Sequence, residues 1–98
     1  MTKEQQELYD KFVDYVMNDP NWKSWQDQMA IEESLEFALS ILHLARGKND
    51  RTDLVSEIAD IENMIGQIKA MHNITEEEVG DERIRKVKRA IEKHNLDL

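Results

Sequence analysis

Residues 29–45 read MAIEESLEFALSILHLA and form the most apolar stretch of the chain. One apolar stripe recurs in it at helical spacing and comprises Ile31, Leu35, Ala38, Leu42 and Ala45. A second stripe comprises Ala30, Phe37, Ile41 and Leu44. Apolar residues on two faces are typical of a central helix that is buried on several sides, so we expect a helix from about Trp22 to Arg46. A single chain of 98 residues can hardly cover such a helix, so we also expect an oligomer.

Residues that start or end helices also lie on both sides of this central segment. Thr2 can cap a first helix over residues 3–18, with Gln5 as the second half of a weak capping box. Pro20 ends that helix, because proline disfavours a helical conformation in the residue before it. Gly47 stands where the central helix needs a left-handed residue at its C-terminal end.

Two more helices are predicted in the second half of the chain. Asp50 or Thr52 can cap a helix that extends to about His72. Gly66 lies inside this helix and indicates a close helix contact there.

Thr75 starts the fourth helix with a capping-box signature, and Gly80-Asp81 is expected to interrupt or restart it. The expected organisation is one all-α domain over residues 1–98. It divides into an N-terminal helix (1–19), a helical hairpin (22–73) and a basic C-terminal helix (75–95).

The composition excludes several functional classes. The chain has 21 acidic against 13 basic residues, a net charge of −8, which argues against binding duplex nucleic acid or an anionic membrane surface. The absence of cysteine excludes a disulfide framework, a thiolate zinc site and a cysteine nucleophile. Apolar runs are only a few residues long, so we expect neither a membrane span nor a signal-peptide core, and a cytoplasmic location.

Acidic residues interrupt the apolar pattern at two places. Glu32, Glu33 and Glu36 share one face of the central helix at 100° per residue, and Glu57 and Asp60 lie one turn apart on the next helix. In an antiparallel hairpin the two sets are offset by about four residues, roughly 6 Å along the axis. Frayed helix ends or a slanted turn can absorb that offset, so the sets can face each other.

Facing carboxylates would need a counter-charge. Unit charges 4 Å apart repel by about 1 kcal/mol in water and about 4 kcal/mol at an effective dielectric of 20. A hard divalent cation such as Mg²⁺ binds carboxylate oxygens and removes that repulsion. The alternative is that both sets lie on solvated helix faces, and spacing alone leaves both interpretations open.

The two acidic sets match known motifs. Glu32-Glu33-Ser34-Leu35-Glu36 fits EExxE and Glu57-Ile58-Ala59-Asp60 fits ExxD, with 20 residues between them. Together they resemble the signature of the MazG-type all-α nucleoside triphosphate pyrophosphohydrolases, especially the short single-domain members, many of them associated with phages or mobile elements. The resemblance covers about residues 22–95. It implies a four-helix MazG-like bundle, oligomeric with a shared helical core, that hydrolyses a (deoxy)nucleoside triphosphate to the monophosphate and pyrophosphate.

The resemblance also implies roles for the motif acids. Carried over position by position, Glu33, Glu36, Glu57 and Asp60 would hold Mg²⁺, with Mn²⁺ as a substitute. Glu32 and Glu33 are the implied catalytic residues, and Glu32 is left for a second metal, for support of the metal ligands or for activation of the attacking water. The implied partners are the nucleotide and further copies of the chain, as a homodimer or homotetramer.

Four further residues are candidates for substrate binding, and each has an ordinary structural alternative. Arg83 and Lys86 could contact phosphates, or lie on a solvated face paired with neighbouring acids. Asn63 could bind a ligand sugar or a water on the metal, or simply lie at the surface. Trp25 could flank a base pocket, or anchor the core or a subunit interface.

Two other functions remain open at this point. A non-catalytic helical interaction module would need only solvated acids and an apolar face. A phosphoribosyl-ATP pyrophosphohydrolase-like enzyme would share the metal carboxylates. The sequence does not identify the nucleotide.

Overall fold

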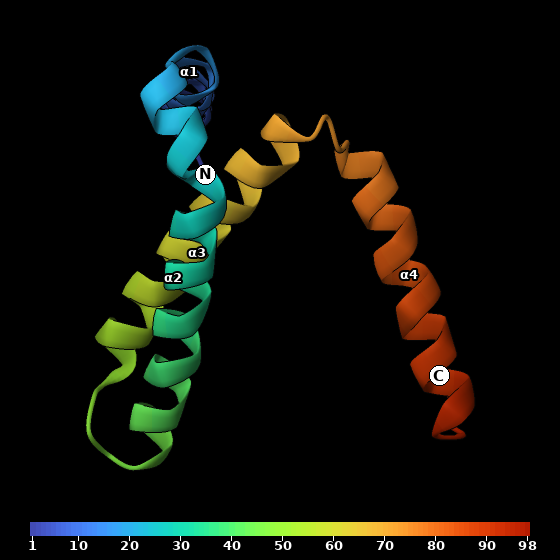
Figure 1. Cartoon of the computed structure of the whole chain (residues 1–98). Helices are drawn as coiled ribbons and strands as arrows, with labels where there is room; N and C mark the ends of the chain where they lie inside the picture. Colours follow the sequence, from blue (N-terminus) through green and yellow to red (C-terminus); the bar gives the residue numbers. More distant parts are fainter.

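The computed structural model describes all 98 residues and is entirely helical (Figure 1). Four helices follow one another in the chain: α1 (Lys3–Asn18), α2 (Pro20–Ala45), α3 (Arg51–Met71) and α4 (Glu76–Lys93). The predicted all-α class with four helices is therefore confirmed. None of these helices combines the length and the apolar character needed to cross a membrane.

The helix ends follow from local capping. Thr2 and Gln5 form a reciprocal capping box at the start of α1, and Asp50 forms one with Asp53 at the start of α3. After α2 the chain turns at Gly47, whose φ of +69° is the left-handed conformation that glycine adopts without strain. These predicted caps are confirmed.

Two local predictions were wrong. The turn before α2 is shorter than expected, because Pro20 is the first residue of that helix and Asp19 caps it by accepting from the Asn21 and Trp22 amides. Proline fits there because the first helical N–H has no intrahelical partner to lose. The predicted interruption at Gly80-Asp81 is absent, and α4 is continuous. A glycine costs a helix interior about 1 kcal/mol, which eighteen residues can absorb.

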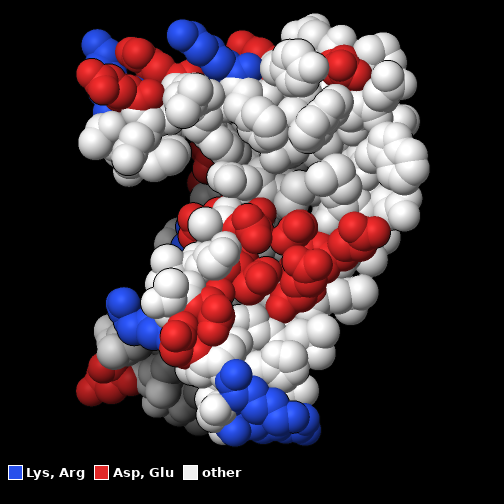
Figure 2. All heavy atoms as spheres, turned by 90° about the vertical axis from the view of Figure 1, so that its left-hand side faces the viewer, with Lys and Arg blue, Asp and Glu red and all other residues white.

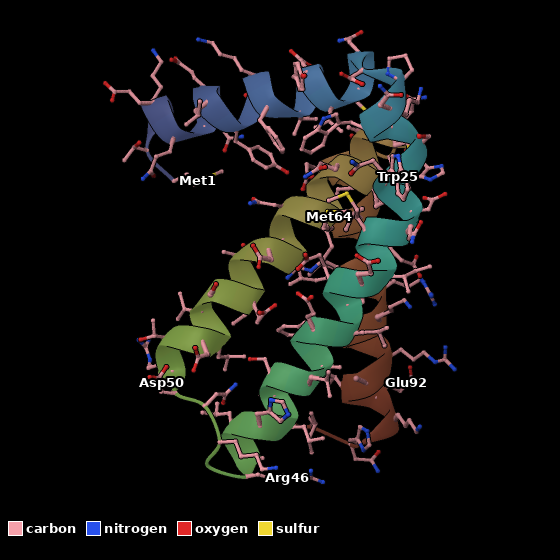
Figure 3. The ribbon with its side chains drawn as sticks, turned by 60° about the vertical axis from the view of Figure 1, so that its left-hand side comes forward. Met1, Trp25, Arg46, Asp50, Met64 and Glu92 are labelled. Atoms are coloured by element: carbon pink, nitrogen blue, oxygen red, sulfur yellow. The ribbon has the colours of Figure 1, made fainter.

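Three of the helices pack together and the fourth does not. α2 and α3 form an antiparallel hairpin, and α1 crosses its open end and contacts both (Figure 3). α1 meets α3 where a methyl group on Gly66 would overlap the Tyr9 hydroxyl, so the predicted close contact at this glycine is confirmed. At its first residue α4 is joined to α3 by the Lys69–Glu76 ion pair over 2.9 Å, but no helix packs along it and it projects away from the hairpin (Figure 1). One chain alone therefore does not close the expected four-helix bundle.

The interior of the single chain is small and partly polar. Val16 and Met64 are its only buried apolar residues, while Gln26, Ser40 and Gln67 are buried polar ones. Within one chain α2 is covered only in part, as expected of a helix that a single chain can hardly cover, and its burial on several sides stays a prediction. Ile31 and Leu35 on the face away from α3 are 62% and 61% exposed.

Candidate metal centre

The α2–α3 hairpin brings acids from both motifs together. Glu33 and Glu36 on α2 and Glu57 on α3 each offer a carboxylate oxygen, and these three oxygens lie within 4.8 Å of one another. α2 ends at Ala45 and α3 begins at Arg51, so a short turn absorbs the offset between the motifs. The prediction that the two acidic sets face each other is confirmed for these three residues.

Glu32 and Asp60 border this cluster. Both are exposed, and neither belongs to the group of three whose oxygens converge. Their charges nevertheless reach it, because both contribute to raising the pKa of Glu33, and Asp60 also raises that of Glu57. Figure 2 shows a band of acidic side chains across the middle of this side of the molecule.

Two of the cluster's carboxylates are partly withdrawn from water. Oε2 of Glu33 and Oε2 of Glu57 are buried and accept no hydrogen bond. Burial is the largest cause of the raised pKa of both carboxyls, followed by the negative charge of Glu36. Buried acceptors without donors are costly, so these oxygens are suited to a cation.

A hollow of about 400 Å³ adjoins Glu36 and Glu57 towards the hairpin turn. Ser40 and Asn49 line it, and the Asn49 amide donates to the Ser40 carbonyl and hydroxyl oxygens over 3.1 and 3.2 Å. Because a carbonyl can only accept, this bond fixes the amide orientation and leaves Asn49 Oδ1 buried without a partner. His43, Asp53 and Ser56 complete the polar lining.

Sequence reasoning missed Ser40 and Asn49. A signal existed for Ser40, because Gln26, Glu33 and Ser40 recur every seven residues and so share one face of an otherwise apolar helix. Gln26 and Ser40 are both buried on that face. Asn49 gives no periodic signal, because it lies in the turn.

None of the four predicted substrate-binding residues lines the hollow beside the converging carboxylates in a single chain. Asn63 and Arg83 line a separate hollow of about 890 Å³ between α1, α3 and the start of α4, which contains none of the motif acids. Trp25 lies at the α1 end of α2, beside a smaller apolar hollow (Figure 3). Lys86 is exposed on α4. Asn63 lies one helical turn beyond Asp60 on α3, about 60° away from it around the axis, and lines the hollow on the α1 side.

Comparison with known proteins does not extend this description. The chain matches no protein-family model, no curated protein and no solved structure. Interpretation of the site therefore depends on its geometry and on the two acidic motifs.

The residues present fit a hard divalent cation. All the donors are carboxylate oxygens, the ligand type that Mg²⁺ and Mn²⁺ prefer. The 4.8 Å span of the three oxygens compares with about 4 Å between opposite ligands of one Mg²⁺ ion. The two orphaned oxygens of Glu33 and Glu57 supply acceptors that no protein donor uses.

Proposed function

We propose that this chain is a Mg²⁺-dependent hydrolase that cleaves a nucleoside triphosphate between its α and β phosphates. The products are the monophosphate and pyrophosphate. The observation that carries the proposal is the convergence of Glu33, Glu36 and Glu57, two of which hold a buried, unpaired oxygen. The EExxE and ExxD spacing supports the same chemistry.

In this proposal the motif acids have two roles, metal binding and proton transfer. Glu33, Glu36 and Glu57 would hold Mg²⁺ or Mn²⁺, and Asp60, which borders them, would complete the set. The ion, when bound, lowers the pKa of a coordinated water and offsets the charge of the triphosphate. Glu32 is exposed beside Glu33 and accepts the proton of the attacking water. An acidic protein with a net charge of −8 could otherwise hardly bind an anionic substrate.

The substrate contacts in this proposal need more than one chain. Within one protomer, the hollows lined by Trp25, Asn63 and Arg83 contain none of the motif acids, and Lys86 is exposed on α4. The proposal therefore includes self-association, as a homodimer or homotetramer, which would set residues of one copy beside the acids of another. Which nucleotide is bound depends on that assembled surface.

A panel of nucleoside and deoxynucleoside triphosphates tests the proposal. We expect Mg²⁺-dependent release of pyrophosphate from at least one of them. Glu36→Gln and Asp60→Asn should each reduce the rate by at least the roughly 10–100-fold that is lost when even a residue supporting a metal ligand is changed. Glu92→Gln, on the far part of α4, is the matched control and should retain the wild-type rate (Figure 3).

Phosphoribosyl-ATP belongs in the same panel, because it would use the same carboxylates. Turnover of that substrate alone would assign the related activity instead. No turnover of any triphosphate by pure protein at micromolar concentration would contradict the proposal.

A further inference from the structure

The side of α2 that faces away from α3 carries a continuous apolar seam. It comprises Ile31, Leu35, Ala38, Leu42 and Ala45, at successive intervals of four, three, four and three residues. All five are exposed in the single chain. No charged residue interrupts the seam, and this spacing repeats every seven residues, the period of helices that pack along their length.

The exposed face of α2 is therefore apolar, unlike that of an ordinary surface helix. Leu35 and Leu42 lie about 180–200° around the helix axis from Glu33. The face towards α3 carries the polar positions Gln26, Glu33 and Ser40, of which Gln26 and Ser40 are buried. A surface helix normally buries its apolar stripe and exposes its polar one, so the seam needs a cover that one chain does not supply.

The dimensions of the chain show how much surface is left to cover. It exposes 8105 Å², whereas a compact monomer of this mass exposes about 5,800 Å². The radius of gyration is 16.5 Å, against about 13 Å for a compact domain of this length. The excess of about 2,300 Å² includes the projecting α4 as well as the seam, and it exceeds the roughly 800 Å² that each partner contributes to a standard interface.

We infer that the seam binds the same seam of a second copy, in an antiparallel pair of α2 helices related by a two-fold axis near Ala38. In that arrangement Leu35 meets the partner's Leu42, and Ile31 meets the partner's Ala45. The small side chain of Ala38 at the centre allows the two helices to approach closely. A two-fold contact uses the same patch on both copies and leaves no seam unpaired, which suits an identical partner better than an unrelated one.

The pairing also affects the candidate metal centre. Leu39 lies between the seam and Glu36 around the helix, is half exposed, and lines the hollow beside Glu36 and Glu57. A partner helix on the seam therefore runs along the open edge of that hollow. This inference deepens the self-association on which the proposed function rests, but its test does not depend on turnover.

Cross-linking tests the pairing directly, because the natural chain has no cysteine. Ala38→Cys places one thiol at the centre of the seam, where antiparallel helices bring equivalent Cα atoms within disulfide range. Treatment with diamide, which is reduced as the two thiols become a disulfide, should convert most of the protein to a covalent dimer. Glu4→Cys on α1 is the matched control and should remain largely monomeric on a non-reducing gel.

Light scattering after size exclusion gives an independent measurement. The wild-type mass should be twice 11.6 kDa, or four times if dimers pair further. Leu35→Glu should halve the wild-type mass while circular dichroism stays helical. Leu8→Glu, at an exposed leucine of α1, should not change it. A monomeric wild type, a dimer unaffected by Leu35→Glu, or Ala38→Cys no more reactive than Glu4→Cys would each overturn the inference.

Discussion

Individual acidic residues of the candidate metal centre oppose folding when no cation is bound. Burial and neighbouring carboxylates raise the pKa of Glu33 and Glu57 above the ordinary value of 4.5. Between 4.5 and the raised values the folded protein therefore holds more protons than the unfolded chain. Stability from this source is greatest at low pH and falls as pH rises through that window.

This gives a pH prediction for the metal-free protein. In EDTA, the melting temperature of the wild type should fall as pH rises above 4.5, and Glu33→Gln should flatten the fall. At neutral pH the variant should melt a few degrees higher than the wild type, because one buried charge is gone. Thermal melts of both proteins across the pH range measure this dependence of the melting temperature on pH. Parallel pH profiles for the two proteins would contradict the account.

At the residue scale, the candidate site could be predicted in part. The spacing of the acids predicted that Glu33, Glu36 and Glu57 lie together, because each pair lies on one helix or across one short hairpin turn. The partners of Asn49 could not be predicted, because its bond to Ser40 spans nine residues and depends on the path of the turn. The position of Arg83 relative to the site depends on the direction of α4, which helical periodicity does not determine.

At the scale of elements, α1 is held on α3 through Gly66. Gly66→Ala should improve helix propensity by up to about 1 kcal/mol, yet the added methyl overlaps the Tyr9 hydroxyl. To make room, the Tyr9 side chain must move and give up its contact with α3, so we expect the melting temperature to fall. In a Tyr9→Phe background the same substitution should cost less. An unchanged or higher melting temperature for the single variant would show that the two helices do not depend on this contact.

α4 should depend on self-association for its stability. Beyond the Lys69–Glu76 ion pair at its first residue, no helix of its own chain packs along it, and isolated helices of this length are marginal in water. Backbone amides of α4 should therefore exchange with deuterium faster than those of α2 and α3 in dilute protein, with protection rising at higher concentration. Hydrogen-exchange mass spectrometry measures both. Strong protection of α4 at concentrations where the chain is monomeric would contradict this reading.

The elements themselves could be predicted because their signals are local. Thr2, Asp50 and Thr75 each cap a helix through the backbone of the next few residues. The predicted interruption at Gly80 was wrong because a glycine only lowers helix propensity, while its neighbours on both sides favour the helix. The direction of α4 could not be predicted. Its apolar residues indicate that the helix needs a partner, but they do not identify the surface that it packs against.

For the whole molecule, cation binding separates an enzyme from an interaction module. A ligand at 100 times its dissociation constant stabilises the folded state by about 2.7 kcal/mol. Millimolar Mg²⁺ or Mn²⁺ should therefore raise the melting temperature by several degrees, and EDTA should reverse the rise. Glu57→Gln should abolish the shift, while Glu92→Gln should keep it. An equal response in the wild type and Glu57→Gln would indicate solvated acids without a defined metal site.

The most direct test of the central claim is the identity of the products. Phosphorus NMR of a triphosphate incubated with pure protein and Mg²⁺ distinguishes cleavage between the α and β phosphates from loss of the terminal phosphate. The account predicts the nucleoside monophosphate and pyrophosphate, with no signal above background for Glu36→Gln. A diphosphate with orthophosphate, or the same products from wild type and Glu36→Gln, would contradict it.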